Sequence, residues 1–159
     1  MNRLCFLFFV VVFSVPAFAQ PETDLCISGG AGVGKNGFAE IGLSKRTVGD
    51  ERHYSISFTG YSLEFKPGSH FIIAPKAGIW GAAMSPLCIG LNLLFYTDFV
   101  KGSLVFRPEI GFALPFLKVA YGYNSSLTNK NFAGINKHNA GILFHVKLKA
   151  LKPKLPARK

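Results

Sequence analysis

Residues 29–35 read Gly-Gly-Ala-Gly-Val-Gly-Lys and have the spacing of a phosphate-binding loop. In such a loop the lysine reaches the phosphates, a Ser or Thr directly after it binds Mg²⁺, and a helix begins there. This chain has Asn36 in place of the Ser or Thr, and the residues after Gly37 alternate as in a strand. The segment is therefore predicted to be a glycine-rich strand that leads into a turn, and no cofactor is expected.

Three residues have the types of a serine-hydrolase catalytic set, which combines a Ser, a His and an acid. His53 and Ser55 share a face of a predicted strand, and the other end of that strand carries Glu64. The three side chains of such a set must lie within hydrogen-bond reach of one another. Extended chain places Ser55 and Glu64 roughly 30 Å apart, so they cannot form one site. The histidines also lack metal-ligand spacing; they are His53, His70, His138 and His145. The chain is predicted not to be an enzyme and to bind no metal.

The elements that position the remaining charges are strands, and the clearest of them lie between Ser103 and Tyr123. Pro115 and Phe116 reverse the chain there, and the side chains alternate on both sides of the reversal. The apolar face carries Leu104, Phe106, Pro108, Ile110, Phe112, Leu114, Leu117, Val119, Tyr121 and Tyr123. A period of two is that of a strand, and strands of about ten residues with one apolar face are typical of membrane barrels.

Eight such strands are predicted, and each can pair with its neighbour in sequence. Their ranges are 26–34, 38–46, 54–65, 71–80, 87–99, 103–114, 117–123 and 138–150. In the third strand the alternation changes parity, and a β-bulge near Gly60 would explain the change. The outward residues predicted for that strand are Tyr54, Ile56, Phe58, Tyr61, Leu63 and Phe65. Pro75 and Pro108 lack the N–H that a ladder uses and predict local irregularities.

The first 19 residues have the three parts of a secretory signal peptide: a positive start, an apolar run and a small-residue cleavage site at 17–19. Cleavage leaves a periplasmic lead at 20–25, a barrel at 26–150 and a basic tail at 151–159. The formal net charge is +10, and it becomes +9 when Arg3 is removed, so anionic partners are expected. Cys26 and Cys88 start strands on opposite walls and are predicted to stay unbridged, because a disulfide needs Cα atoms within about 7 Å.

The inward face of the predicted barrel carries both signs of charge. The residues placed there are Glu40, Lys76, Arg107, Glu109 and Lys118, with Asp98 and His145 nearer the ends. Charges in a low-dielectric interior must be paired. A network of ion pairs that fills the lumen is therefore predicted, and a pore lined by the same groups is the alternative.

The last predicted strand gives the chain a resemblance. Asn139, Gly141, Phe144 and Val146 stand at the fixed positions of the pattern polar, any, Gly, any, any, apolar, any, apolar. With eight alternating strands after a signal peptide, the chain resembles small eight-stranded bacterial outer-membrane β-barrel proteins, in style the short uncharacterised barrels of the Bacteroidota type. The resemblance implies an up-and-down transmembrane barrel that the barrel-assembly machinery recognises through this strand. The barrel is predicted to be a monomer.

The resemblance also implies that both chain ends lie in the periplasm, which turns four loops outward, at 34–37, 66–70, 100–102 and 125–137. The lysines in these loops are Lys35, Lys66, Lys101, Lys130 and Lys137, and they are predicted to contact lipopolysaccharide phosphates. A rim that is merely soluble is the alternative. An aromatic belt is predicted at the same strand ends. Its members are Phe65, Phe71, Phe95, Phe99, Tyr121 and Tyr123.

The sequence therefore predicts an all-β outer-membrane barrel of a Gram-negative bacterium with a structural or surface-interaction role. A soluble exported barrel that holds an apolar ligand, as lipocalins do, is the main alternative, because alternation does not tell which face is inside. A lipid-A-modifying barrel enzyme is a further alternative. Nucleic acid is not an expected partner, because the chain is predicted to be exported.

Overall fold

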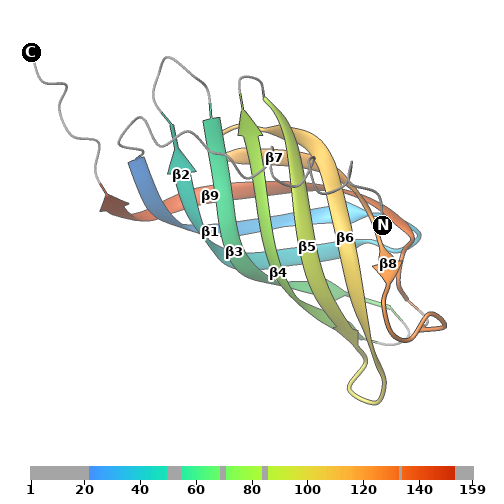
Figure 1. Cartoon of the computed structure of the whole chain (residues 1–159). Coiled ribbons are helices and arrows are strands. Elements are labelled where there is room, and N and C mark those ends of the chain that lie inside the picture. The colour runs from blue at the N-terminus through green and yellow to red at the C-terminus, as the bar shows by residue number, and fades with distance from the viewer. Residues whose placement is uncertain (1–21, 50–54, 69–70, 84–85, 133, 153–159) are drawn as a thin grey trace, which may run out of the picture.

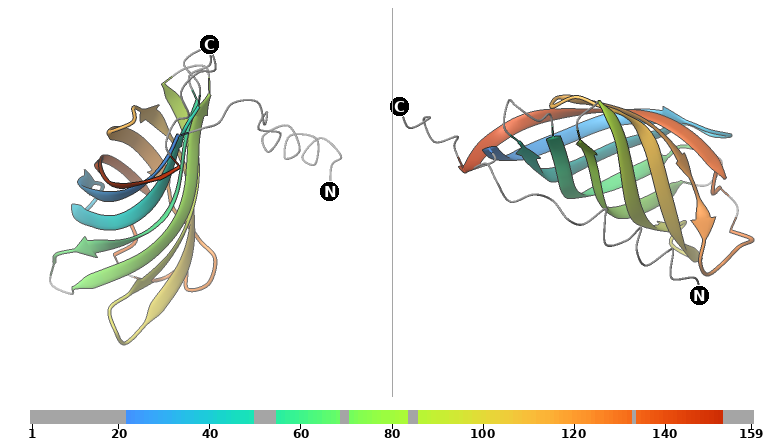
Figure 2. Two further views of the ribbon diagram at one scale, coloured as in Figure 1. Left: turned by 90° about the vertical axis from the view of Figure 1, so that its left-hand side faces the viewer. Right: turned by 45° about the horizontal axis from the view of Figure 1, so that its top comes forward.

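The computed structural model describes residues 22–49, 55–68, 71–83, 86–132 and 134–152. This part of the chain is all-β, as predicted, and contains no helix. Its strands are β1 (Glu22–Val33), β2 (Phe38–Val48), β3 (Ser55–Lys66), β4 (Ile72–Ala83), β5 (Leu87–Thr97), β6 (Gly102–Ala113), β7 (Leu117–Tyr123), β8 (Ser125–Ser126) and β9 (His138–Lys152). Figures 1 and 2 show the tilted strands that form one curved wall.

The wall is a closed barrel of eight antiparallel strands. The strands pair in the order β1, β2, β3, β4, β5, β6, β7 and β9, and β9 pairs with β1 to complete the ring. The short β8 adds two pairs to β6. Closure leaves no long unpaired edge around the middle of the barrel, which is how such folds avoid pairing with other chains.

The two ends of the barrel differ in what they carry. Thr23 pairs with Lys152, so both ends of the described chain lie together, at what we call the terminal end. The turns 34–37 and 98–101 and residues 67–68 and 71 lie at the opposite end, the loop end, together with residues 124–132 and 134–137, which we call segment 124–137. No helix long and apolar enough to cross a membrane occurs among the described residues.

Alternation along β5 shows how the sequence builds this wall. Exposed and buried positions alternate from Leu87 to Tyr96 without a break. The outward set is Leu87, Ile89, Leu91, Leu93 and Phe95. Successive side chains of a strand point to opposite faces, so one set of residues makes the outer surface and the other fills the interior. The outward face predicted between Leu104 and Tyr123 is observed on β6 and β7, and the same alternation occurs on β4 and through most of β9.

The bulge predicted in the third strand is wrong. β3 pairs with β2 and with β4 in one register past Gly60, so its even-numbered residues face inward throughout. Ile56 and Phe58 are therefore buried in the barrel instead of facing outward, while Tyr61 faces outward as predicted. Gly60 instead allows β3 to lie close to β2, because a Cβ at this position would lie 2.4 Å from the carbonyl oxygen of Leu43. Tyr54, which was predicted to face outward, lies outside the described residues.

Both prolines stand where strand pairing is interrupted. The pairs between β4 and β5 include Ile73 with Thr97 and then resume at Lys76, so Pro75 lies in the gap. Pairing of β6 with β7 begins at Glu109, directly after Pro108. The missing N–H of each proline explains the interruption, and the barrel closes in spite of it.

The predicted boundaries need correction at both chain ends. β1 begins at Glu22, inside the segment predicted as a lead, and β9 continues through Lys152, inside the segment predicted as a tail. The pairing of β1 with β9 shifts register near Asp24 and Leu25, which accommodates this extension. The predicted signal peptide, His53, His70 and residues 153–159 lie outside the described residues. Cys26 and Cys88 are buried and free, as predicted.

Candidate functional site: the filled interior and the loop end

Glu64 and Arg107 form the centre of the barrel interior. Neither is more than 1% exposed. The guanidinium donates from Nη1 to Glu64 Oε1 at 2.5 Å and from Nη2 to Glu64 Oε2 at 3.0 Å. Tyr96 donates its hydroxyl to Glu64 Oε2 at 3.0 Å, and Asn124 Oδ1 accepts from Arg107 Nε at 2.7 Å. This bidentate geometry with added hydrogen bonds is what makes a buried charge pair tolerable.

Two further ion pairs adjoin this centre. Lys76 Nζ lies 2.5 Å from Glu40 Oε1 and 3.5 Å from Glu64 Oε1. Lys118 Nζ lies 2.7 Å from Glu109 Oε2, and Glu109 Oε1 lies 3.8 Å from Arg107 Nη1. Six side chains, three of each sign, thus form one neutral layer, which we call the ion-pair layer.

The structure brings together all five interior residues that the sequence singled out and adds Glu64. The five alone hold three cations and two anions, and that imbalance was the signal that a sixth group was missing. Alternation also gives the position of Glu64, which stands between the predicted outward residues Leu63 and Phe65 and therefore on the inner face. Asp98, predicted to lie inside, instead lies in the turn after β5, where its Oδ1 accepts from the backbone of Val100 and Lys101.

An apolar cluster fills the interior on the terminal side of the ion-pair layer. Phe58 and Trp80 stack with ring centroids 4.0 Å apart, and the His145 ring lies 4.2 Å from that of Phe58. Ser44 Oγ lies 3.4 Å from His145 Nδ1. The other buried members are Ile56, Ala82, Cys88 and Ala113. His145 is thus packed against aromatic rings near the end of the lumen.

A second apolar cluster closes the loop side, and segment 124–137 completes it. Its members are Ile72, Ala74, Leu94, Tyr96, Val105 and Phe132. Phe132 comes from the segment and is 7% exposed. Asn136 exchanges two hydrogen bonds with the backbone of Asn36, at 2.8 and 3.3 Å, which holds the segment over the barrel mouth.

Little space remains inside. A cavity of about 30 Å³ lies beside His145, Lys76 and Lys118, and another of about 20 Å³ lies beside Arg107 and Asn139. Spaces of this size hold a water molecule. Neither of these two cavities is large enough to hold a ligand of the size of a fatty acid.

The terminal end carries its own ion pairs. Arg46 Nη2 lies 2.6 Å from Asp24 Oδ2, and Arg46 Nη1 donates to the carbonyl of Pro115 at 2.8 Å. Lys147 Nζ lies 2.6 Å from Asp24 Oδ1 and 2.7 Å from Glu22 Oε1. These contacts tie β1, β2 and β9 to the turn between β6 and β7.

Four of the five predicted rim lysines are exposed at the loop end: Lys35, Lys101, Lys130 and Lys137. Lys66 is the exception and needs correction. It is 3% exposed, its Nζ donates to the carbonyl of Gly134 at 3.2 Å, and it lies 4.2 Å from the Tyr96 ring centroid. The regular register of β3 turns this even-numbered residue inward.

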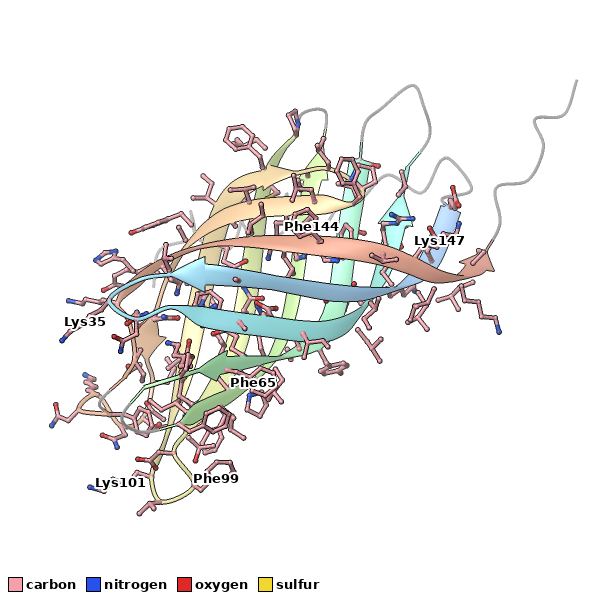
Figure 3. The ribbon with its side chains drawn as sticks, turned by 180° about the vertical axis from the view of Figure 1, so that it is seen from behind. Lys35, Phe65, Phe99, Lys101, Phe144 and Lys147 are labelled. Carbon is pink, nitrogen blue, oxygen red and sulfur yellow. The ribbon has the colours of Figure 1, made fainter. Side chains whose placement is uncertain are left out.

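The outer wall is apolar, and it carries aromatic residues both toward the loop end and, at Phe112 and Phe116, at the terminal end. Phe65 contacts Phe71 with ring centroids 6.4 Å apart, and Tyr121 contacts His138. The exposed aromatic residues of the predicted belt are Phe71, Phe95, Phe99, Tyr121 and Tyr123. Figure 3 shows Phe65 and Phe144 on the outside of the wall. In β9, Asn139 faces inward, while Phe144 and Val146 of the predicted assembly pattern are exposed.

No group of three or more His, Cys, Asp or Glu side chains that could hold a metal ion occurs in the described ranges. Ser55 and Glu64 both lie on β3, near its opposite ends, so the regular strand separates them. Comparison with known proteins adds no assignment, since no family profile, curated protein or solved structure matches the chain.

Proposed function

We propose that the chain is an exported outer-membrane β-barrel protein of a Gram-negative bacterium, with a structural or surface-interaction role and no catalytic activity. The observation that supports this most is the distribution of side chains across the wall. Apolar residues point outward on every long strand, and the charged residues of the middle of the barrel point inward and pair with one another. A lipid surrounding requires this arrangement, since lipid stabilises apolar surface and rejects unpaired charge.

The size of the outer apolar surface favours lipid over water. The outward residues of β5 and β6 form adjacent rows of Leu, Ile and Phe side chains that are about half exposed. Monomeric soluble proteins rarely expose a contiguous apolar patch larger than a few hundred Å². This surface surrounds the barrel, so a soluble monomer would be prone to aggregate.

The main alternative is the soluble barrel with an apolar ligand. Such a barrel needs an apolar cavity, whereas here the ion-pair layer and the two apolar clusters fill the interior around cavities of about 30 and 20 Å³. A conducting pore meets the same obstacle, because a barrel of eight strands is only wide enough for its own side chains. A lipid-A-modifying enzyme would need a catalytic set that a lipid can reach, whereas the buried Ser44 and His145 lie behind the wall.

The loop end supports a role in contact with lipopolysaccharide. Lys35, Lys101, Lys130 and Lys137 are exposed there, and a lysine acts as a point charge toward phosphate. We propose that these lysines contact lipopolysaccharide phosphates around a monomeric barrel. Barrel-assembly machinery is the further proposed partner, through Asn139, Gly141, Phe144 and Val146 of β9.

Fractionation of the cell envelope, combined with gel mobility before and after boiling in SDS, tests the proposal. A band that shifts on heating and that fractionates with the outer membrane is expected, because a closed barrel resists unfolding by cold SDS. Recovery of the protein from the periplasm without detergent would overturn the proposal and favour the ligand-carrying barrel. For lipopolysaccharide contact, the quadruple change of the four exposed lysines to Gln should weaken binding to purified lipopolysaccharide, while Lys45→Gln, a change on the wall of β2, serves as the matched control.

A further inference from the structure

The turn between β5 and β6 has an unusual tip for a surface loop. Phe99 is 73% exposed and Val100 is 86% exposed, and Lys101 follows them. Figure 1 shows that this hairpin projects past the ends of neighbouring strands, and Figure 3 labels Phe99 and Lys101 at its tip. The turn 34–37 at the same end of the barrel carries Lys35 and Asn36 instead.

The tip is also held in one shape. Phe99 has a φ of 69°, in the left-handed region that residues other than glycine rarely adopt. Side chains at the base of the turn hold this conformation. Thr97 Oγ1 accepts from the N–H of Phe99 at 3.0 Å, and Asp98 Oδ1 accepts from the N–H groups of Val100 and Lys101 at 3.0 and 2.7 Å. The backbone donors of the tip are thus paired within the hairpin.

A tip of this kind can enter an apolar surrounding at low cost. An unpaired N–H carried into an apolar medium is strongly unfavourable, and here the three N–H groups already have acceptors. The side chains that lead are an aromatic and an aliphatic one, and the lysine beside them can reach back to a phosphate. These features fit insertion into a bilayer with anionic headgroups.

The tip lies outside the bilayer that would surround the barrel. The outward apolar row of β5 ends at Phe95, and the polar Thr97 and Asp98 separate it from Phe99. An apolar band drawn from Leu87 to Phe99 would follow about 40 Å of strand, or roughly 30 Å of height at the tilt usual in barrels, whereas the usual band is about 25 Å tall. Phe99, although predicted as a member of the aromatic belt, therefore lies with the tip beyond the apolar band of the wall, on the side from which a second membrane would approach.

We propose that the β5–β6 tip, residues 98–101, inserts Phe99 and Val100 into an apposed anionic lipid bilayer. The inference goes beyond the proposed function, and it rests on that function for the placement of the barrel. The exposed Lys35, Lys130 and Lys137 at the same end add long-range attraction to an anionic surface. The barrel thereby joins two lipid surfaces, one around its wall and one at its loop end.

The test uses the full mature chain reconstituted in nanodiscs and vesicles that contain phosphatidylcholine and phosphatidylglycerol. Co-flotation of the nanodiscs with the vesicles is expected for the unchanged protein. The double change Phe99→Asn and Val100→Ser should reduce binding about a hundredfold, because each apolar side chain of this size contributes roughly tenfold on burial. Asn tolerates the left-handed backbone, which keeps the turn shape. Leu127→Ser, at a 53% exposed apolar residue of segment 124–137, is the matched control and should bind as before.

A fluorescence measurement locates the tip. In Val100→Trp, brominated lipid placed only in the added vesicles should quench the new tryptophan, and Lys101→Gln should weaken binding to anionic vesicles alone. Quenching only by brominated lipid in the nanodisc would overturn the inference, because the tip would then lie in its own membrane. Unchanged binding of the double variant would overturn it as well. If the protein does not enter nanodiscs at all, the proposed membrane function fails instead.

Discussion

The interior and the outer wall of this barrel are built by alternate residues of the same strands, yet the interior holds paired charges and the outer wall exposes apolar side chains. On β6, Arg107 is 1% exposed and bonded to Glu64, while its neighbour Phe106 is 36% exposed on the outside. The interior tolerates charge because every cation of the ion-pair layer has a carboxylate partner. Under the proposed function, the apolar outer wall borders lipid, so each face carries the side chains that suit its own surroundings.

The two faces of the wall also differ in how strongly a substitution affects the stability of the barrel. An interior residue has neighbours on all sides that cannot leave, and a change there creates a cavity or an unpaired charge. An outward residue borders a medium that can rearrange, so changes of size matter little and changes of polarity matter more.

The largest loss of stability is expected for Glu64→Ala. Removal of this carboxylate leaves Arg107 buried without its bidentate partner, at a cost of about 3–5 kcal/mol in the free energy of unfolding. Urea unfolding in lipid vesicles, followed by the mobility shift on a gel, measures the loss. The double change Glu64→Leu and Arg107→Met should recover most of it, since a neutral apolar pair of similar volume removes the unpaired charge. Wild-type stability of Glu64→Ala would contradict the ion-pair layer as a stabilising unit.

The next comparison concerns two phenylalanines. Phe58→Ala removes a ring that stacks on Trp80 and should cost about 3–4 kcal/mol, because the surrounding side chains cannot close the cavity. Phe112→Ala, at a residue 61% exposed on the outer wall, should cost clearly less, since lipid can fill the space. Equal losses for the two variants would mean that the two faces do not differ in this way.

A charge on the outer wall gives the third comparison. Leu91→Lys places an ammonium group in the middle of the outward apolar row of β5 and should destabilise the barrel in vesicles by about 2–4 kcal/mol. Ser57→Lys, also outward but on β3 near the terminal end, should cost no more than about 1 kcal/mol, because the group can reach the interface. In a soluble barrel both changes would leave the free energy of unfolding almost unchanged, and that result would contradict the proposal that the outer wall contacts lipid.

The smallest effect is expected for Tyr96→Phe. The change removes one hydroxyl that donates to Glu64 and leaves the ring in place, so a loss of about 1.5–3 kcal/mol is expected for a hydrogen bond to a charged group. Leu93→Met, an apolar exchange at a neighbouring outward position, should be almost neutral. A larger loss for Leu93→Met than for Tyr96→Phe would reverse the predicted order of the two faces.

Much of the wall could be predicted from the sequence, because alternation is a local property. The outward residues of β4, β5, β6, β7 and β9 follow from it directly. In β3 it failed near Gly60, where small and polar outward residues such as Ser57 and Thr59 made Ile56 and Phe58 look like the outer set. Those two residues pack inside the barrel with Trp80, Ala82 and Cys88, and only the closed ring with its fixed register reveals this.

The interior network was predictable in part. Its members follow from the inward positions of charged residues, and a count of charges would have added Glu64. Two features depend on contacts between distant parts of the chain. Phe132 reaches into the barrel mouth from a polar segment, and Lys66 turns inward toward Gly134 of the same segment. The shape of the turn at Phe99 likewise depends on side chains whose role appears only once the hairpin is formed.

The central claim is that the apolar face of each strand contacts lipid, and quenching of tryptophan by brominated lipid tests it most directly. Trp80 is native and faces inward at 8% exposure, while Leu91 faces outward on the adjacent strand. In vesicles with brominated acyl chains, Leu91→Trp in a Trp80→Phe background should be strongly quenched, and native Trp80 should be quenched far less. Weak quenching of the residue 91 tryptophan by lipid, together with ready quenching by aqueous iodide, would contradict the claim.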